Sequence, residues 1–434
     1  MLSGFDASFL AAETAETPMH TLTVLTLRVP PGERNVRAFA TRALARAAHA
    51  LPALRARPRA RRWGHPVWEE VPVDLDAHVS AETLWPTGRR TVEDALGELI
   101  EPLLPRDRPL WAARILERPG SDEVTIGLKY HHALGDALAS VRSLAILSGH
   151  GEPSVGTPPL ARSSVRGALA WVGELASLLV ATLLGLVRSA RHAQPIPFST
   201  RNEAYDGPIG ARRHIGRATL RFEAIAAARR GTDATVNDVL LTLVARALRR
   251  LDPVRRFDGP LIAAQPVAVG EGGHDRGNHL SSMLVPVHVE AGDAQSCLRA
   301  TAASTRAAKS AHHARGVDLV MRWSELAPAW ALRLTWALIR RLPRPPAHLV
   351  VSNIPGPKGA LMLGDAALTS VSTVGPLLTT TGLNVTFESY AGGVHVLVAS
   401  AGGIDPRALA HALADAADEL AHDDREATRP SLAA

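Results

Sequence analysis

The sequence of 434 residues is poor in cysteine, lysine and aromatic residues. Its single cysteine, Cys297, excludes an intramolecular disulfide and a cysteine-based metal cage, and this fits a reducing cytoplasm. Aromatic residues make up 4%, so leucine, valine and alanine must fill most of the core. Arginine supplies nearly all the positive charge, because the chain has only three lysines. The net charge of +6 is compatible with anionic lipid, nucleic acid or a phosphorylated cofactor, and it does not choose among them.

The sequence also lacks an obvious secretion signal or membrane-spanning segment. Residues 1–20 have no basic start before an apolar run, and they include Asp6 and Glu13. The longest apolar stretch, residues 168–187, reaches the roughly 20 residues that a transmembrane helix needs, but Glu174 interrupts it. We therefore interpret this stretch as a buried or membrane-surface helix. The expected location is the cytoplasm, with peripheral contact at the inner face of the cell membrane or at lipid droplets.

The length favours two domains of roughly 200 residues each. Residues 148–166 are rich in glycine, proline and serine, and residues 194–216 are also loop-like. We therefore predict an N-terminal domain at 1–150, a linker with the apolar helix at 151–215, and a C-terminal domain at 216–434. Both halves mix helical and strand patterns, which predicts an α/β class. Hydrophobic periodicity predicts strands at 19–29, 124–129, 259–269 and 280–289, a strand pair near 67–73, a hairpin at 384–399, and helices at 35–50, 91–104, 138–147, 235–250, 294–314 and 328–342.

The segment with the clearest chemical signal runs from Tyr130 to Ala137. A predicted strand ends at His131 and His132, and a predicted helix begins near Asp136. Histidine is the usual side chain for taking a proton at neutral pH, and strand ends that lead into loops often carry reactive groups. Asp136 can hold the loop rigid by pairing with an arginine or by capping the helix. The residues alone leave a catalytic base, a metal site and a structural histidine open. A metal site is the least favoured, because neighbouring strand residues point in opposite directions.

The pattern His131-His132-x-x-x-Asp136 resembles the HHxxxDG motif of the bacterial wax ester synthase/diacylglycerol acyltransferases. These enzymes belong to the CoA-dependent acyltransferase superfamily, with chloramphenicol acetyltransferase and peptide-synthetase condensation domains. The resemblance continues along the chain in the same order. It covers the DASF opening at residues 6–10, PLW at 109–111, GPIG at 207–210 with Arg212 and Arg213, ND at 237–238, GN at 277–278 and SNIPGP at 352–357.

The resemblance implies two chloramphenicol-acetyltransferase-like α/β domains with a tunnel at their interface. Acyl-CoA would enter from one side and a lipophilic alcohol from the other. His132 would be the general base in a ternary complex without an acyl-enzyme. His131 is the other histidine of the motif, and Asp136 would be a structural support, commonly paired with an arginine. The products would be triacylglycerol from diacylglycerol, or a wax ester from a fatty alcohol. Acyl-CoA is a co-substrate here, and no cofactor, metal or nucleic acid is implied.

Six more residues are carried over by the resemblance as substrate-binding candidates, namely Asn237, Asp238, Asn278, Ser352, Asn353 and Gly356. Each also has a plainer interpretation, which is a helix cap for Asn237 and Asp238, a loop residue for Asn278 and a Pro-Gly turn for 352–357.

The motif glycine is Ala137 in this chain, which a helical backbone tolerates and a positive φ would not. Two alternatives stay open. The same fold could act on a secondary-metabolite hydroxyl or amine, or the chain could be a catalytically silent acyl-CoA or lipid-binding homologue.

Two segments are candidates for contact with lipid. Arginines crowd residues 55–62, where the alternatives are a solvated face and attraction to CoA phosphates or anionic lipid. Residues 328–344 predict a hydrophobic helix with an arginine-rich end, which suits either a buried core helix or a membrane interface.

Overall fold

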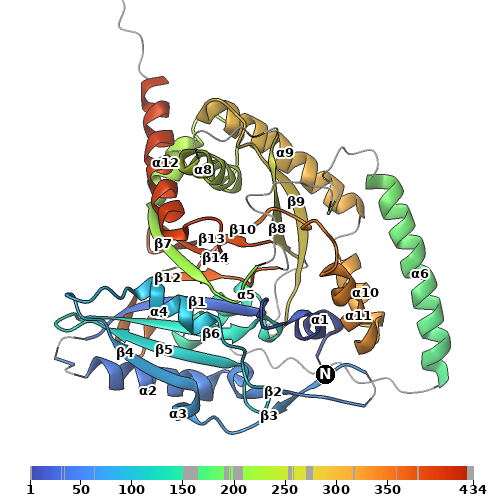
Figure 1. Ribbon diagram of the computed structural model, residues 1–434, viewed down its shortest axis with the longest axis horizontal. Coiled ribbons are helices and arrows are strands. Elements are labelled where there is room, and N and C mark those ends of the chain that lie inside the picture. The colour runs from blue at the N-terminus through green and yellow to red at the C-terminus, as the bar shows by residue number, and fades with distance from the viewer. Residues whose placement is uncertain are drawn as a thin grey trace, which may run out of the picture.

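Two six-stranded β-sheets form the framework of the chain, and helices pack against them (Figure 1). The computed structural model describes residues 2–149 except 31, 34 and 63, and then residues 165–189, 195, 197–198, 209–252, 257, 259–269, 277–315, 318–378 except 358, and 381–427. The mixture of strands and helices in both halves confirms the predicted α/β class.

The first sheet has the strand order β11-β12-β1-β6-β5-β4. Helix α2 packs on one of its faces and helix α4 on the other, because successive strand residues point to opposite sides. Leu25 of β1 therefore joins the core under α2, whereas Val24 joins the core under α4. The elements are β1 (His20–Arg28), α2 (Val36–Ala50), β4 (Val79–Thr83), α4 (Val92–Ile100), β5 (Trp111–Glu117), β6 (Glu123–His131), β11 (Met362–Leu363) and β12 (Ala366–Val374).

The second sheet has the strand order β7-β14-β13-β10-β8-β9. Strand β10 runs parallel to both of its neighbours, and the other pairs are antiparallel. Helices α7, α8, α9 and α12 pack together on this sheet and form the largest apolar core. The elements are β7 (His214–Arg221), α7 (Phe222–Ala228), α8 (Val236–Leu251), β8 (Leu261–Ala268), β9 (Leu280–Val287), α9 (Ala294–Arg315), β10 (Leu349–Ile354), β13 (Leu383–Tyr390), β14 (Gly393–Ser400) and α12 (Pro406–Ala427).

Strand β12 connects the two halves. It pairs antiparallel with β1 of the first sheet, from Leu22 opposite Val374 to Arg28 opposite Ala367. It also contacts β13 and β14 of the second sheet. The sequence predicts domains that are contiguous in the chain, whereas in space the second half supplies two strands to the sheet of the first half.

The remaining elements complete the ends of the molecule. The predicted apolar helix is α6, which packs against α9 and α10 along the outer edge in Figure 1. Among the described residues, no helix is both long enough and apolar enough to cross a membrane. Most of the predicted linker at 151–164 and 190–208 lies outside the described residues. The other elements are α1 (Gly4–Ala12), η1 (Pro52–Arg55), β2 (Ala56–Arg59), β3 (Val67–Glu70), α3 (Leu75–His78), η2 (His132–Leu134), α5 (Ala137–Leu147), α6 (Val165–Ser189), α10 (Leu319–Leu326) and α11 (Ala329–Ile339).

Candidate active site

The predicted histidine pair lies in a short loop, residues 130–137, which we call the histidine loop. It leads from the end of β6 through the 3₁₀ turn η2 into α5. Antiparallel pairing of β6 with β1 places His131 opposite His20. The backbone N–H of His132 then donates to the carbonyl of Met19 at 2.7 Å. The ends of two paired strands therefore fix the backbone of the loop.

The His132 ring is half-buried and is held by two neighbours from different elements. Its Nδ1 lies 3.0 Å from Oγ1 of Thr21, a buried residue of β1. The ring of Phe9 in α1 meets it edge-on, with 4.5 Å between the ring centres. Burial lowers the pKa of His132 to about 4, although the negative charge of Asp136 acts in the opposite direction. The imidazole is therefore neutral near pH 7, as a general base must be.

His131 points away from His132 into a buried charged cluster. Its Nδ1 accepts the Ala133 N–H at 3.0 Å, so its other nitrogen, Nε2, must carry a proton. That Nε2 lies 3.4 Å from Glu13 Oε1, and Nε2 of His20 lies 3.5 Å from the same oxygen. Burial works against the charge of Glu13, but the contact with His131 and the nearby Arg106 lower its pKa to about 2. His131 therefore stabilises the turn after His132 by accepting the Ala133 N–H, and Glu13 favours the His131 tautomer that carries its proton on Nε2.

No metal site is formed by these side chains. Among the described residues, no group of three or more histidine, cysteine, aspartate or glutamate side chains is arranged to hold a metal ion. The two histidines of the motif face opposite sides of the strand end, as the alternation of strand side chains requires.

Asp136 holds the beginning of α5. Its Oδ1 accepts the Ala139 N–H at 3.0 Å as an N-cap, and its Oδ2 accepts the His279 N–H at 3.1 Å. The same carboxylate therefore joins the histidine loop to the second half of the chain. The resemblance implies an arginine partner for this residue, whereas these two hydrogen bonds come from backbone amides.

Asn278 makes a second link between the halves. Its Nδ2 donates to the backbone carbonyl of His132 at 2.7 Å and to Oδ1 of Asp6 at 2.8 Å. Its backbone N–H donates to the same Asp6 oxygen at 3.0 Å. The neighbouring Gly277 has φ +80°, and a Cβ there would lie 2.9 Å from Asp6 Oδ2, so both its conformation and its lack of a side chain are needed. One amide thus ties α1, the histidine loop and the second sheet together.

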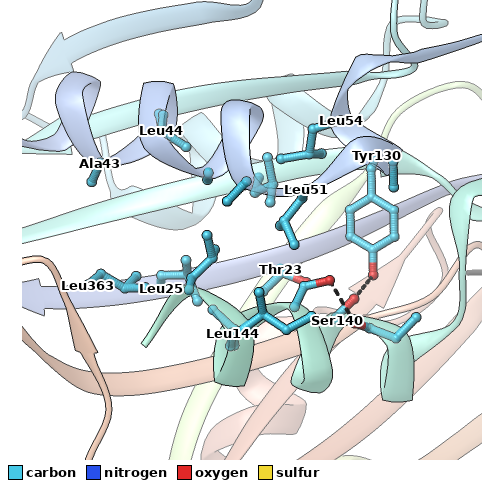
Figure 2. Close-up of a pocket in the computed structure, with 18 of the residues that line it drawn as sticks. Thr23, Leu25, Ala43, Leu44, Leu51, Leu54, Tyr130, Ser140, Leu144 and Leu363 are labelled. Atoms are coloured by element: carbon cyan, nitrogen blue, oxygen red, sulfur yellow. Dashed lines mark hydrogen bonds between the residues drawn. The ribbon is translucent and has the colours of Figure 1, made fainter. Parts of the chain in front are cut away.

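The histidine loop lines an apolar cavity of about 360 Å³, through Tyr130 and residues 134–136. Its walls come from α2 and η1 on one side, from α5 on the other, and from β1 and β6 between them, as Figure 2 shows. Tyr130 and Ser140 bond to each other through their hydroxyls at one end (Figure 2). The resemblance implies a tunnel between the domains, whereas this cavity lies between the first sheet and helices α2 and α5. Its lining includes Leu25, Leu44, Leu51, Leu54, Ile126, Leu128, Leu134, Gly135, Asp136, Leu144, Leu147 and Leu363.

Comparisons with known proteins decide the family. The model of the wax ester synthase/diacylglycerol acyltransferase catalytic domain matches residues 2–240, and the model of the C-terminal domain of the same family matches residues 276–421. The chain belongs to the wax ester synthase/diacylglycerol acyltransferase family. It is therefore an acyltransferase of that family.

Individual relatives agree with this assignment. A Mycobacterium tuberculosis (strain H37Rv) protein with the provisional name diacylglycerol O-acyltransferase is 31% identical, over 92% of this chain and 91% of its own length. Another from the same strain is 30% identical, over 92% and 85%. Among solved structures, the wax ester synthase/diacylglycerol acyltransferase of Marinobacter aquaeolei VT8 has a TM-score of 0.68 at 22% identity, over 98% and 99%. The starter condensation domain of rhizomide synthetase, solved in complex with C8-CoA, has a TM-score of 0.56 at 14% identity, over 99% and 96%. These two likenesses show the two-domain fold.

The one departure from the family motif is Ala137, in the place of the glycine. Ala137 is the first residue of α5, so its backbone is helical, a conformation that alanine adopts without strain. The glycine that the loop does need is Gly135, where a Cβ would lie 2.8 Å from the Cβ of Ala139. The backbone at position 137 therefore does not require glycine.

Asn237 and Asp238 lie at the start of α8. Asp238 forms the capping box with Thr235 and accepts a further hydrogen bond from Thr305, so its carboxylate is used within the fold. This confirms the helix cap expected from the sequence. Asn237 is half-buried, and its Oδ1 accepts a hydrogen bond from Gln265.

Ser352 and Asn353 lie at the end of β10, opposite Thr386 and Phe387 of β13, and both are half-buried. Gly356 follows them, at a point where a Cβ would lie 1.8 Å from the carbonyl oxygen of Ser389. Among the described residues, no hydrogen bond joins Ser352, Asn353 or Gly356 to the histidine loop. Of the six carried-over candidates, Asn278 is the one that the structure bonds directly to His132.

Sequence reasoning did not assign a role to Thr21, Phe9, Asp6 or Glu13. Asp6 and Glu13 lie near the start of the chain, but Asn278, which bonds to Asp6, and His131, which contacts Glu13, are more than 100 residues away in the sequence. Thr21 looked like an ordinary strand threonine. Only the register that places Thr21 opposite Tyr130 brings its hydroxyl to His132.

Proposed function

We propose that this protein transfers a fatty acyl group from acyl-CoA to the hydroxyl of a lipophilic alcohol. The observation that carries the proposal is that one loop holds His132 and also lines the apolar cavity, through Tyr130 and residues 134–136. The cavity has the size of a ligand pocket, and its lining suits an alkyl chain. Diacylglycerol would give triacylglycerol, and a fatty alcohol would give a wax ester. The names of the relatives and of the Marinobacter structure support these two acceptors.

His132 is the proposed general base. In the active tautomer, Nδ1–H donates to Thr21 Oγ1, which leaves the lone pair of Nε2 to accept the proton of the alcohol. The edge contact with Phe9 limits rotation of the ring. A pKa of about 4 keeps the imidazole unprotonated before the reaction, and it also makes the imidazolium a strong acid for the second step.

The reaction then proceeds within a ternary complex. The alcohol oxygen attacks the thioester carbonyl while its proton passes to His132 Nε2. The tetrahedral oxyanion collapses, the carbon–sulfur bond breaks, and Nε2 returns the proton to the CoA thiolate. Ester and free CoA are the products, no acyl-enzyme forms, and the scheme requires no cofactor or metal besides the co-substrate.

Asp136 and Asn278 act by positioning in this scheme. Each ties the histidine loop to the second half of the chain: Asp136 accepts from the backbone N–H of His279, and the side chain of Asn278 donates to the carbonyl of His132. Loop position matters because a misplacement of about 1 Å can lower a rate roughly a hundredfold.

The test is an assay of the purified chain with labelled acyl-CoA. Diacylglycerol, hexadecanol and polar alcohols are offered separately, and the labelled products are separated by chromatography. We expect ester from the two lipophilic acceptors and a large loss of activity in His132→Ala. If neither lipid is acylated, the acceptor class is wrong. Full activity in His132→Ala would instead contradict the role of the base.

A further inference from the structure

Helix α11 exposes an apolar stripe to solvent. Trp330, Leu334 and Leu338 are four residues apart, so they lie on one face of the helix. Their exposed fractions are 64%, 52% and 53%. Val320 on the preceding helix, α10, is also exposed. Globular proteins rarely leave such a row open, which marks this surface for a partner.

Helix α6 adds a second apolar surface beside it. Its side chains are buried or half-buried along one narrow stripe, and Thr182 accepts a hydrogen bond there from Trp323 of α10 at 3.0 Å. Around the rest of the helix, seven leucine and valine side chains among the described residues are between 46% and 63% exposed. Figure 1 shows α6 along the outer edge of the molecule. These seven are Val172, Leu179, Val180, Leu183, Leu184, Leu186 and Val187.

The charge around this surface indicates what covers it. Residues 326–348 contain four arginines and no aspartate or glutamate, whereas α6 carries the exposed Glu174 and α10 the exposed Glu325, so positive charge is concentrated at α11 and the residues that follow it. Arg333 and Arg341 are exposed near the stripe of α11. A second copy of the chain, related by a two-fold axis through α11, would place arginine against arginine. An anionic surface would instead complement them, and tryptophan with arginine is the usual combination at a membrane interface.

The same helices lie next to the candidate active site. Helix α11 packs on α1, and Arg340 donates to the carbonyl of Ala12 at the end of α1. Helix α1 carries Phe9, which contacts the His132 ring. A single helix therefore separates this surface from His132.

We propose that this surface, formed by α6, α10 and α11 and called here the α6–α11 face, docks on a bilayer that contains anionic phospholipid. The docking itself stands on exposure and charge. Its consequence rests on the proposed function: the lipophilic alcohol would reach His132 from the membrane instead of from water.

The test is flotation of the full chain with vesicles. One set contains phosphatidylcholine alone, and the other contains phosphatidylcholine with phosphatidylglycerol. We expect binding to the second set, weakened by salt. Arg333→Gln with Arg341→Gln should weaken binding roughly tenfold or more, since each arginine near an anionic surface contributes about 1 kcal/mol. Trp330→Ala with Leu334→Ala should also reduce it strongly.

The matched control is Trp85→Ala with Leu103→Ala. These residues have similar exposure, 63% and 44%, but lie in the first domain. The control should float like the wild type, and melting curves check that all variants fold. The proposal is wrong if the wild type fails to float with the anionic vesicles, or if Trp330→Ala with Leu334→Ala floats as well as the control. It is also wrong if light scattering shows that the chain is a dimer, if Trp330→Ala with Leu334→Ala dissociates this dimer, and if the chain does not bind vesicles.

The vesicle assay involves no turnover, so it separates the two proposals. Binding without acyl transfer would leave the docking intact and contradict the proposed function. Acyl transfer to a dispersed alcohol without binding to vesicles would support the proposed function and contradict the docking.

Discussion

The sharpest prediction about the chemistry concerns the hydroxyl of Thr21, which contacts the ring of the proposed base, His132. Thr21→Val keeps the shape of the side chain and removes the partner of His132 Nδ1, at 3.0 Å. This bond should strengthen as the ring becomes an imidazolium, because hydrogen bonds from charged donors are roughly twice as strong as neutral ones. A neutral bond contributes about 1 kcal/mol, so the transition state loses about 1–2 kcal/mol more than the ground state. The expected result is roughly a tenfold lower kcat.

The pH profile gives a second readout of the same change. Loss of the acceptor destabilises the imidazolium, so the pKa of His132, already lowered by burial to about 4, should fall further. The acidic limb of kcat/KM therefore moves to lower pH in Thr21→Val. A purely structural role would not move it.

Two variants control this experiment. Thr21→Ser retains the hydroxyl and should retain most of the activity. Thr242→Val removes an equally buried threonine hydroxyl, which bonds to the Asp238 carbonyl at 2.8 Å, and should affect stability without changing kcat. The reasoning is refuted if Thr21→Val stays within about twofold of the wild type, or if Thr21→Ser is as impaired as Thr21→Val.

Four other changes test the surroundings of His132. Asn278→Ala removes the donor to Asp6 and to the His132 carbonyl, and should lower the free energy of unfolding by about 2–4 kcal/mol in urea titrations; an unchanged value would contradict the link. His131→Ala leaves the Ala133 N–H without its acceptor and should lower kcat more than His131→Asn, whose amide oxygen can replace Nδ1. Contact with His131 and Arg106 holds the pKa of Glu13 near 2, although burial acts in the opposite direction. The ionised Glu13 therefore contributes up to about 3 kcal/mol to the free energy of unfolding above pH 4.5, and this contribution is lost as the pH falls toward 2. Glu13→Gln should flatten that part of the stability curve, and an unchanged acid limb would show that Glu13 is not responsible. Ser143 of α5 also lines the cavity, so Ser143→Phe narrows it and should lower kcat/KM for long-chain acyl-CoA at least about tenfold while sparing short-chain acyl-CoA; equal losses would place the acyl chain elsewhere.

The sequence by itself determined several of the elements and the family. Local periodicity was sufficient for β1, α2, β6, α8 and the hairpin of β13 and β14, because each has a pattern that repeats within its own length. The capping box of α8 was also readable, since Thr235 and Asp238 are three residues apart. The order of the family segments along the chain placed the histidine loop at the centre of the site.

The tertiary structure decided which groups meet at that loop. Asp6, Asn278 and His132 are far apart in the chain, and no local pattern indicates that one amide joins them. Strand β12 pairs with β1 in the first sheet although residues such as Leu22 and Val374 are far apart in the chain, so no local pattern predicts the pairing. The position of the Thr21 hydroxyl depends on strand register, because a shift of one residue turns a side chain to the opposite face of the sheet. The sequence therefore identified the proposed base, and long-range pairing decided how that residue is held.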